Sequence, residues 1–453
     1  MYKKSYYNYI KELGNKDVVL YNTRTGAVAV VEKNNVEIVE NILKNPKQNT
    51  DTEFFSSLYD NGFIVDENCN EYENIKTKYE NNFNSNRLIN IVMLPIEMCN
   101  FSCPYCFIYN YKNKIMDDCV YNSIKKYIQN RIENSENNNK KINLKLTWFG
   151  GEPLLKKDKI FSYMSEIHEQ FDKSCNIFSS IITNAYDLSY EVFSKLLKSG
   201  ISNYQITFDG AKENHDILRK LNNGDGTFDT IIKNLQEIKN HISSNDKFAF
   251  AIRINFLRNT YKKIFGLIDD LFLIIGNDQR FNIYCRPIYN FETKRDSIKE
   301  VEDDIFTISD GLKVQNDFTR YIADKTNDTK EFRMINDYLP LPTISWCGED
   351  NTYSTIIGSD ASVYICDSLI GDESISIGKL NENGNIEYNE KSIEWKKSVF
   401  EFDNFSDCKQ CKSLPICVGS CKRERIYGNS KPCLWTEEDI YKSMEKYYLA
   451  NYN

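Results

Sequence analysis

Between residues 88 and 285, short apolar runs alternate with stretches whose apolar residues recur at helical intervals. The runs predict strands at 88–94, 142–149, 177–183, 204–208, 248–256 and 281–285. The stretches between them predict helices at 117–133, 157–172, 188–199, 228–241 and 260–274. Strands that alternate with helices in this way form parallel β–α units. Six units predict an α/β fold, a partial (β/α)6 TIM-like barrel at 88–300, with its functional residues at the carboxyl ends of the strands.

The first 70 residues follow another pattern. Two apolar runs flank a turn at Thr25 and Gly26 and predict paired strands within 18–31. Apolar positions at helical spacing then predict two short helices, and 63–65 predicts a returning strand. We expect a small winged-helix-like module at 1–70. The polar stretch at 71–87 is rich in Asn and Glu and indicates a linker.

The last third of the chain consists mainly of short segments. Residues 301–344 are charged and partly helical, and we interpret them as a bridging segment. Residues 345–453 form a separate predicted domain that cysteines and glycines interrupt. A composition of this kind cannot build a large apolar core by itself, so an inorganic scaffold is a reasonable substitute.

Charge and hydropathy exclude several classes of protein. The net charge is −8 and no long Lys/Arg cluster occurs, which argues against nucleic acid as the partner. The longest apolar runs are far too short to cross a bilayer, so no membrane partner is expected. The first residues contain no apolar signal region, and we therefore expect a cytoplasmic protein.

Fourteen cysteines are the strongest compositional signal, and they are clustered. Three lie between Cys99 and Cys106, and seven lie between Cys347 and Cys433. In a large chain without an export signal, such clusters indicate metal or redox chemistry rather than disulfides.

The first cluster is a loop of three cysteines, Cys99, Cys103 and Cys106, directly after the first predicted barrel strand. A four-iron four-sulfur cluster normally takes four thiolates, so three leave one iron open to another ligand. The alternative is a zinc site or a set of buried thiols. Zinc would require a fourth nearby Cys or His, and none of the three histidines of the chain lies in this loop.

The Cys-x3-Cys-x2-Cys loop resembles that of the radical S-adenosylmethionine (SAM) superfamily, and other motifs follow in the order of that family. The resemblance implies that SAM binds the open iron and yields a 5′-deoxyadenosyl radical. It also implies a glycine-rich motif for the amino group of SAM, with Glu152 accepting from the ammonium, and an arginine suited to the carboxylate. The residues expected to bind this cofactor are Phe107, Gly150, Gly151, Glu152, Thr183, Asn184, Thr207, Asp209, Arg219 and Arg253.

The second group of cysteines resembles the SPASM domain, which carries auxiliary clusters in some radical SAM enzymes. The resemblance assigns one cluster to Cys408, Cys411, Cys417 and Cys433, and another to Cys347, Cys366 and Cys421. Three four-iron clusters are thus expected in all. A pair of zinc knuckles is the alternative.

Two positions bear on the reaction. Some family members supply a further cysteine where this chain has Tyr353, so the Cys347 cluster has either an open iron for a substrate thiolate or a substitute ligand such as water or Tyr353. Asp367, directly after Cys366, resembles the candidate base of anaerobic sulfatase maturases. Its alternative role is a turn Asp that binds backbone.

The N-terminal module resembles small modules that bind the leader of ribosomally made, modified peptides on a sheet edge. The whole pattern is similar to that of peptide maturases, and it predicts hydrogen abstraction from a precursor peptide and a cysteine thioether cross-link. Flavodoxin or ferredoxin is the expected reductant. The alternatives are formylglycine formation as in anaerobic sulfatase maturases, peptide epimerisation, carbon–carbon cross-linking, and a non-catalytic, metal-stapled peptide-binding protein.

Overall fold

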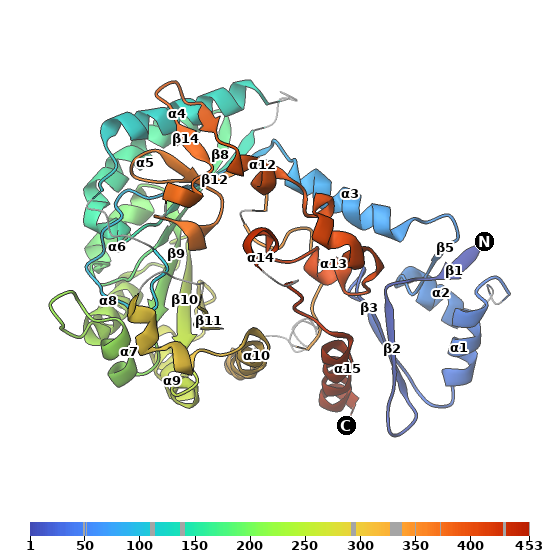
Figure 1. Cartoon of the computed structure of the whole chain (residues 1–453). Coiled ribbons are helices and arrows are strands. Elements are labelled where there is room, and N and C mark those ends of the chain that lie inside the picture. Colours follow the sequence, from blue (N-terminus) through green and yellow to red (C-terminus); the bar gives the residue numbers. More distant parts are fainter. Residues whose placement is uncertain are drawn as a thin grey trace. The chain divides into compact units, whose positions relative to one another are not determined.

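The computed structural model of the chain describes residues 1–48, 50, 52–108, 114–135, 141–290, 296–326, 338–348, 350–371, 373–428 and 432–452. The chain divides into two compact units (Figure 1). Unit 1 comprises 1–84, 327–352 and 396–453, and unit 2 comprises 85–326 and 353–395. The expected boundaries differ, because the residues assigned to one C-terminal domain are shared between the units.

Six parallel strands, paired in sequence order, form the main part of the sheet in unit 2. They are β6 (Leu88–Met93), β7 (Ile142–Trp148), β8 (Cys175–Ile182), β9 (Ile201–Phe208), β10 (Ala249–Phe256) and β11 (Phe281–Pro287). Parallel strands in this order require a crossover between each pair, which the intervening helices provide. All six predicted strands are confirmed, and with them the partial barrel.

Helices lie along one side of these strands (Figure 1). The crossover helices are α4 (Asp118–Glu133), α5 (Lys157–Phe171), α6 (Tyr190–Lys198), α7 (Lys212–Leu218), α8 (Phe228–His241) and α9 (Ile264–Ile275), and α10 (Ile308–Lys325) follows β11. Short 3-10 turns are η1 (Pro153–Lys156), η2 (Tyr261–Lys263), η3 (Asp296–Glu300) and η4 (Glu302–Asp304). The sequence predicted five of the six crossover helices and did not predict α7, whose seven residues are too few for a clear periodicity.

The sheet of unit 2 continues into the cysteine-rich region. Strand β12 (Ser354–Ile357) pairs in parallel with β6, and Ile357 lies opposite Met93. The sheet then adds, all antiparallel, β13 (Ser362–Tyr364), β14 (Gly378–Leu380) and β15 (Ile386–Tyr388). The turns η5 (Asp367–Leu369) and η6 (Glu373–Ile375) and helix α12 (Lys391–Lys396) complete this part. Residues 353–395 thus belong to the barrel sheet and not to a separate domain.

Unit 1 contains the N-terminal module with the elements predicted within 18–65 and with two further strands, β1 (Tyr2–Lys4) and β2 (Asn8–Glu12), that the sequence did not predict. The antiparallel sheet is β2, β3 (Val18–Asn22) and β4 (Val28–Val31), and a separate pair is β1 with β5 (Ile64–Asp66). Helices α1 (Val36–Lys44) and α2 (Glu53–Asp60) pack on them. A core that includes Leu20, Ile42, Phe55 and Phe63 joins the sheet to both helices.

The predicted linker at 71–87 is wrong over most of its length, because it contains helix α3 (Glu71–Phe83). Ile75, Tyr79 and Phe83 recur every fourth residue and are buried on one face of this helix. They pack against Phe400 and its neighbours in the same unit. The polar average of the stretch concealed this narrow apolar stripe, which is sufficient to bury a helix once a partner surface exists.

The C-terminal part of unit 1 is made of short turns and one long helix. Its elements are η7 (Val399–Glu401), η8 (Asp403–Gln410), α13 (Leu414–Cys417), α14 (Lys422–Tyr427) and α15 (Glu437–Tyr452). Ile440, Met444 and Tyr448 of α15 share a core with Tyr9 and Tyr21 of the N-terminal sheet. Among the described residues, no helix is both long and apolar enough to cross a membrane.

Candidate active site

A cavity lies at the carboxyl ends of the barrel strands in unit 2, where α/β folds bind their ligands. Its walls come from the cysteine loop, from the segments after β7, β8 and β11, and from the last residues of β9 and β10. The expected residues that line it are Cys99, Cys103, Cys106, Phe107, Gly150, Gly151, Thr183, Asn184, Thr207, Arg219, Arg253 and Asp367. Residues far apart in sequence therefore face one space.

The three cysteines of the loop all face this cavity. Burial, reinforced by the nearby Glu152, raises the pKa of Cys99 well above its ordinary value. A thiolate at this position requires a compensating positive charge, which iron supplies when it binds sulfur. Among the residues described, no three His, Cys, Asp or Glu side chains converge closely enough to hold a single metal ion. A four-iron cluster distributes its thiolates over different iron atoms, so its ligands need not converge in this way.

Gly150 and Gly151 pack against the backbone of the segment that leads into the cysteine loop. The backbone N–H of Gly151 donates to the carbonyl of Ile96 (3.0 Å), and that of Glu152 donates to the carbonyl of Met98 (2.9 Å). A Cβ on Gly151 would lie 1.9 Å from the Met98 oxygen, and Gly150 has a positive φ of 111°. The glycines thus permit the segment that leads into Cys99 to lie against the end of β7.

Glu152 does not line the cavity. Its side chain is fully buried and accepts hydrogen bonds from Thr183 Oγ1 (2.6 Å), the Asn184 N–H (2.7 Å) and the Leu154 N–H (2.9 Å). Burial raises the pKa of Glu152 to about 7, against the effect of these donors. The resemblance to the radical SAM superfamily implies that this carboxylate accepts from the SAM ammonium. The structure instead places it behind the cavity wall, where it fixes the turn after β8.

The turn that Glu152 holds faces the cysteines. Asn184 donates through Nδ2 to Asn100 Oδ1 (2.7 Å), and the same nitrogen lies 3.8 Å from Cys99 Sγ. A donor near a cluster sulfur is one of the ways in which a protein tunes iron–sulfur centres. Thr183 and Asn184 therefore connect the end of β8 to the cysteine loop.

Of three residues expected to bind the cofactor, Arg219 and Arg253 line the cavity and Asp209 does not. Arg219 faces the cavity, is largely buried, and has no hydrogen-bond partner at Nε among the described residues. An unpaired buried donor of this kind suits an absent acidic ligand. Asp209 is 1 % exposed and lies outside the lining, behind Arg219 and Asn255. Arg253 faces the cavity, and its Nε donates to Asn255 Oδ1 (2.8 Å).

Asp367 enters the same cavity from the loop after β13. Its side chain has accessible surface because it faces the cavity. Desolvation by the surrounding protein raises the pKa of Asp367, and the positive charge of nearby Arg253 partly offsets this increase. Cys366 lies beside it with Sγ 3.1 Å from Ser368 Oγ. A carboxyl group next to the substrate space is a suitable proton acceptor.

Four C-terminal cysteines of unit 1, Cys408, Cys411, Cys417 and Cys433, include thiols that raise the pKa of a neighbouring cysteine. Burial and the neighbouring thiols of Cys411 and Cys408 raise the pKa of Cys417 to about 12, and Cys408 and Cys433 add to burial in raising that of Cys411. Buried Arg425 donates to Cys408 Sγ (3.2 Å). The resemblance to the SPASM domain implies that these four cysteines hold a single auxiliary cluster.

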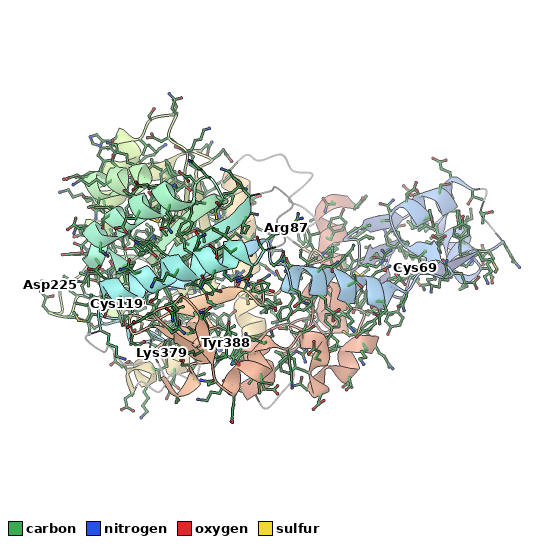
Figure 2. The ribbon with its side chains drawn as sticks, turned by 90° about the horizontal axis from the view of Figure 1, so that it is seen from above. Cys69, Arg87, Cys119, Asp225, Lys379 and Tyr388 are labelled. Carbon is green, nitrogen blue, oxygen red and sulfur yellow. The ribbon has the colours of Figure 1, made fainter. Side chains whose placement is uncertain are left out.

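The other expected auxiliary set is distributed over both units. Cys347 and Cys421 belong to unit 1, and Cys366 belongs to unit 2. Tyr353, at the position where a fourth cysteine was considered, stacks under the Arg131 guanidinium of α4, 3.7 Å from the ring centroid. Of the remaining cysteines, Cys69 and Cys119 reach the surface (Figure 2), while Cys175 and Cys285 are buried.

Comparisons with known proteins agree with this geometry. Residues 93–270 match the model of the Radical SAM superfamily. This part of the chain is therefore similar to radical SAM domains. The matched domain, residues 93–270, works with SAM and a four-iron four-sulfur cluster. The chain is therefore an enzyme.

Curated relatives align over much of the chain. A cysteine-type anaerobic sulfatase-maturating enzyme of Clostridium perfringens (strain 13 / Type A) is 26% identical over 72% of this chain and 86% of its own length. A serine-type enzyme of Bacteroides thetaiotaomicron is 22% identical, over 73% and 81%.

Solved structures share the fold. Native anSMEcpe with bound AdoMet (SAM) superposes with a TM-score of 0.56, 20% identity, and coverage of 80% of this chain and 97% of the other. Streptococcus suis SuiB bound to its precursor peptide SuiA gives a TM-score of 0.52 at 16% identity, over 93% and 95%. The second match includes most of the chain, and it extends the likeness in fold beyond the radical SAM domain.

Some lining residues were not predicted. They are Phe101, Tyr105, Ile108, Phe149, Ile182, Gln205, Pro287, Ile288, Tyr289 and Ser368. Most of them lie within three residues of a strand end or inside the cysteine loop. Position at a strand end was therefore the available signal, and it would also have selected residues that point away from the cavity.

Proposed function

We propose that this chain is a peptide maturase that abstracts hydrogen from a residue of a ribosomally made precursor and joins a cysteine sulfur to carbon. The observation that carries the proposal is the common cavity of the three-cysteine loop, Arg219 and Asp367. One wall of that cavity suits the cofactors and another offers a carboxylate to a substrate. Arg253 and Tyr289 also line the cavity, and their polar groups suit the orientation of a peptide.

The chain supplies position and charge in this reaction. When bound, the cluster and SAM supply a 5′-deoxyadenosyl radical. Cys99, Cys103 and Cys106 hold the cluster, and Arg219 and Thr207 hold SAM beside it. Asp367 accepts the proton that the substrate releases as it is oxidised.

We further assign two auxiliary clusters, making three in all. Cys408, Cys411, Cys417 and Cys433 hold one, which the contact of Arg425 with Cys408 supports. The other takes Cys347, Cys366 and Cys421. An auxiliary cluster held by these cysteines would supply an acceptor for the electron left on the substrate, and flavodoxin or ferredoxin is the proposed reductant.

The N-terminal module is the proposed site for the leader of the precursor. A groove between its sheet and α1 is lined by apolar residues such as Ile10, Val31 and Val36, with Lys4, Lys44 and Glu40 also in its wall. Strand β4 is an edge of that sheet. A free strand edge beside an apolar groove suits an extended peptide. The lysines favour a leader with an acidic residue.

Formylglycine formation is the second candidate. Two observations favour it: Asp367 faces the cavity, and the sulfatase-maturating relatives align over 72% of the chain. The N-terminal module and Tyr353 favour the thioether reaction, because an extra peptide-binding module and a three-cysteine auxiliary site both suit a cysteine-containing precursor.

The test uses anaerobically reconstituted protein and the precursor peptide encoded beside its gene. About twelve irons per chain and release of 5′-deoxyadenosine are expected, with reduced flavodoxin as the electron source. Mass spectrometry then separates the candidates. A thioether retains the sulfur and loses two hydrogens, whereas formylglycine from cysteine loses the sulfur. No deoxyadenosine from the iron-loaded protein would refute both.

Variants at the groove test the leader site separately. Lys4→Glu should weaken binding of the full-length precursor while leaving that of a synthetic core peptide without its leader unchanged. Lys16→Glu, a charge reversal on a turn of the same module, is the matched control. Equal affinity of Lys4→Glu and the parent for the full-length peptide would refute this location.

A further inference from the structure

The hydroxyl of Tyr105 occupies a point where four segments of unit 2 meet. Tyr105 lies within the cysteine loop, between Cys103 and Cys106. Its hydroxyl donates to the carboxylate of Asp209, which follows β9, and accepts from Arg219 Nη1 (3.1 Å). Asn255 of β10 donates to the other Asp209 oxygen, Oδ1 (3.0 Å). The loop that holds the cluster and the arginine suited to SAM are thus joined through one phenol.

The direction of these hydrogen bonds follows from the chemistry of the groups. A phenol has one proton, and Asp209 is the acceptor for it, so the oxygen of Tyr105 accepts from Arg219 Nη1 and, at 3.4 Å, from Asn255 Nδ2. Asp209 is 1 % exposed and outside the cavity lining, and therefore it is not available to a ligand in the cavity. Its carboxylate orients the tyrosine rather than the cofactor.

The guanidinium of Arg219 is held at Nη1, while its Nε has no hydrogen-bond partner among the described residues. Nη1 is used by Tyr105, and the guanidinium carbon lies 5.5 Å from the ring centroid of buried Phe101. Nε is buried and without a hydrogen-bond partner in the described part of the chain. Nε and Nη2 form one edge of the guanidinium fork, the geometry that binds a carboxylate with two hydrogen bonds. Fixing Nη1 therefore determines where that edge points.

We propose that Tyr105 is a positioning residue for SAM: its hydroxyl, oriented by Asp209, holds the guanidinium of Arg219 in place for the carboxylate of SAM. This rests on the proposed function, because it requires SAM in this cavity. The role belongs to a residue that carries no ligand atom for the cluster and that the sequence analysis did not select.

The test compares SAM with decarboxylated SAM, which lacks only the carboxylate. Each is titrated into reconstituted protein, and binding is followed by the change in the electron paramagnetic resonance spectrum of the reduced cluster. Tyr105→Phe should weaken SAM about tenfold, the value of one hydrogen bond to a charged group. Its affinity for decarboxylated SAM should equal that of the parent protein.

Tyr204→Phe is the matched control, because it removes a buried phenol of β9 that donates to the Ile201 carbonyl (2.6 Å), and it should change neither affinity. If Tyr105→Phe fails to load iron like the parent, Asp209→Asn tests the same chain of contacts and should show the same ligand-selective loss. Equal losses for both ligands, or no loss for either, would overturn the proposal. If the parent protein binds SAM but cleaves none, the proposed function fails and this inference does not.

Discussion

Gly151→Ala tests whether the cysteine loop depends on contact with the end of β7. The added Cβ would lie 1.9 Å from the carbonyl oxygen of Met98, the residue before Cys99. An ordinary carbon–oxygen contact is about 3.3 Å, so the two segments must separate by about 1.4 Å. The obstacle is backbone on both sides, and no side-chain rotation can relieve it.

The separation would break contacts that define the loop. The hydrogen bonds from Gly151 N–H to Ile96 and from Glu152 N–H to Met98 are 3.0 Å and 2.9 Å long, and both would be lost. A displacement of about 1 Å in a reacting group costs about a hundredfold in rate, so deoxyadenosine formation should fall by at least that factor. Iron and SAM cleavage are measured together, since iron at the auxiliary clusters should remain.

Gly266→Ala is the matched control for this substitution. Gly266 lies within α9, and nothing lies within 4 Å of a Cβ placed on it. Alanine there should preserve activity and add up to about 1 kcal/mol of stability through its helix propensity. If Gly151→Ala kept parent levels of iron and of SAM cleavage, the idea that this contact positions the cysteine loop would be refuted.

Three further substitutions give separate expectations. Glu152→Gln should alter the pH dependence of stability, because the folded-state pKa of Glu152 is about 7 and its ordinary value is 4.5. As the pH rises from 4.5 to 7, the free energy of unfolding of the parent should fall by about 3 kcal/mol relative to that of the variant. Anaerobic thermal unfolding over this pH range measures the difference. Asp367→Asn should keep deoxyadenosine formation but lose at least tenfold in modified peptide, which chromatography of both products would detect. Arg425→Ala should lose about four irons per chain and retain SAM cleavage; unchanged iron would contradict its role at Cys408.

The periodicity of the sequence was sufficient for the barrel, because buried parallel strands are short apolar runs and each needs a covering helix. The same reasoning missed α3, since Ile75, Tyr79 and Phe83 are a small minority in a polar stretch. It also missed that β12 joins β6, because pairing between remote segments leaves no local pattern.

The motif residues were identified by type, but the contacts they make were not. Glu152 was expected to meet SAM, and it instead accepts three hydrogen bonds behind the cavity wall. The sequence around a glutamate that follows two glycines does not indicate whether its side chain faces the cavity or the protein interior. Tyr105 carries no sign of its partners either, because Asp209 and Arg219 approach it only after the strands pair.

The pairing of β12 with β6 explains how a residue more than two hundred positions from the cysteine loop reaches the same cavity. Ile357 lies opposite Met93, and Tyr364 of β13 lies opposite Ile356. Buried Glu97, just before the cysteines, accepts from the N–H (3.1 Å) and the hydroxyl (2.5 Å) of Ser359. These contacts hold the β12–β13 turn against the segment that leads into Cys99. The loop that carries Asp367 therefore joins the strand that leads into the cysteine loop, and a single sheet positions both Asp367 and the three cysteines at the cavity.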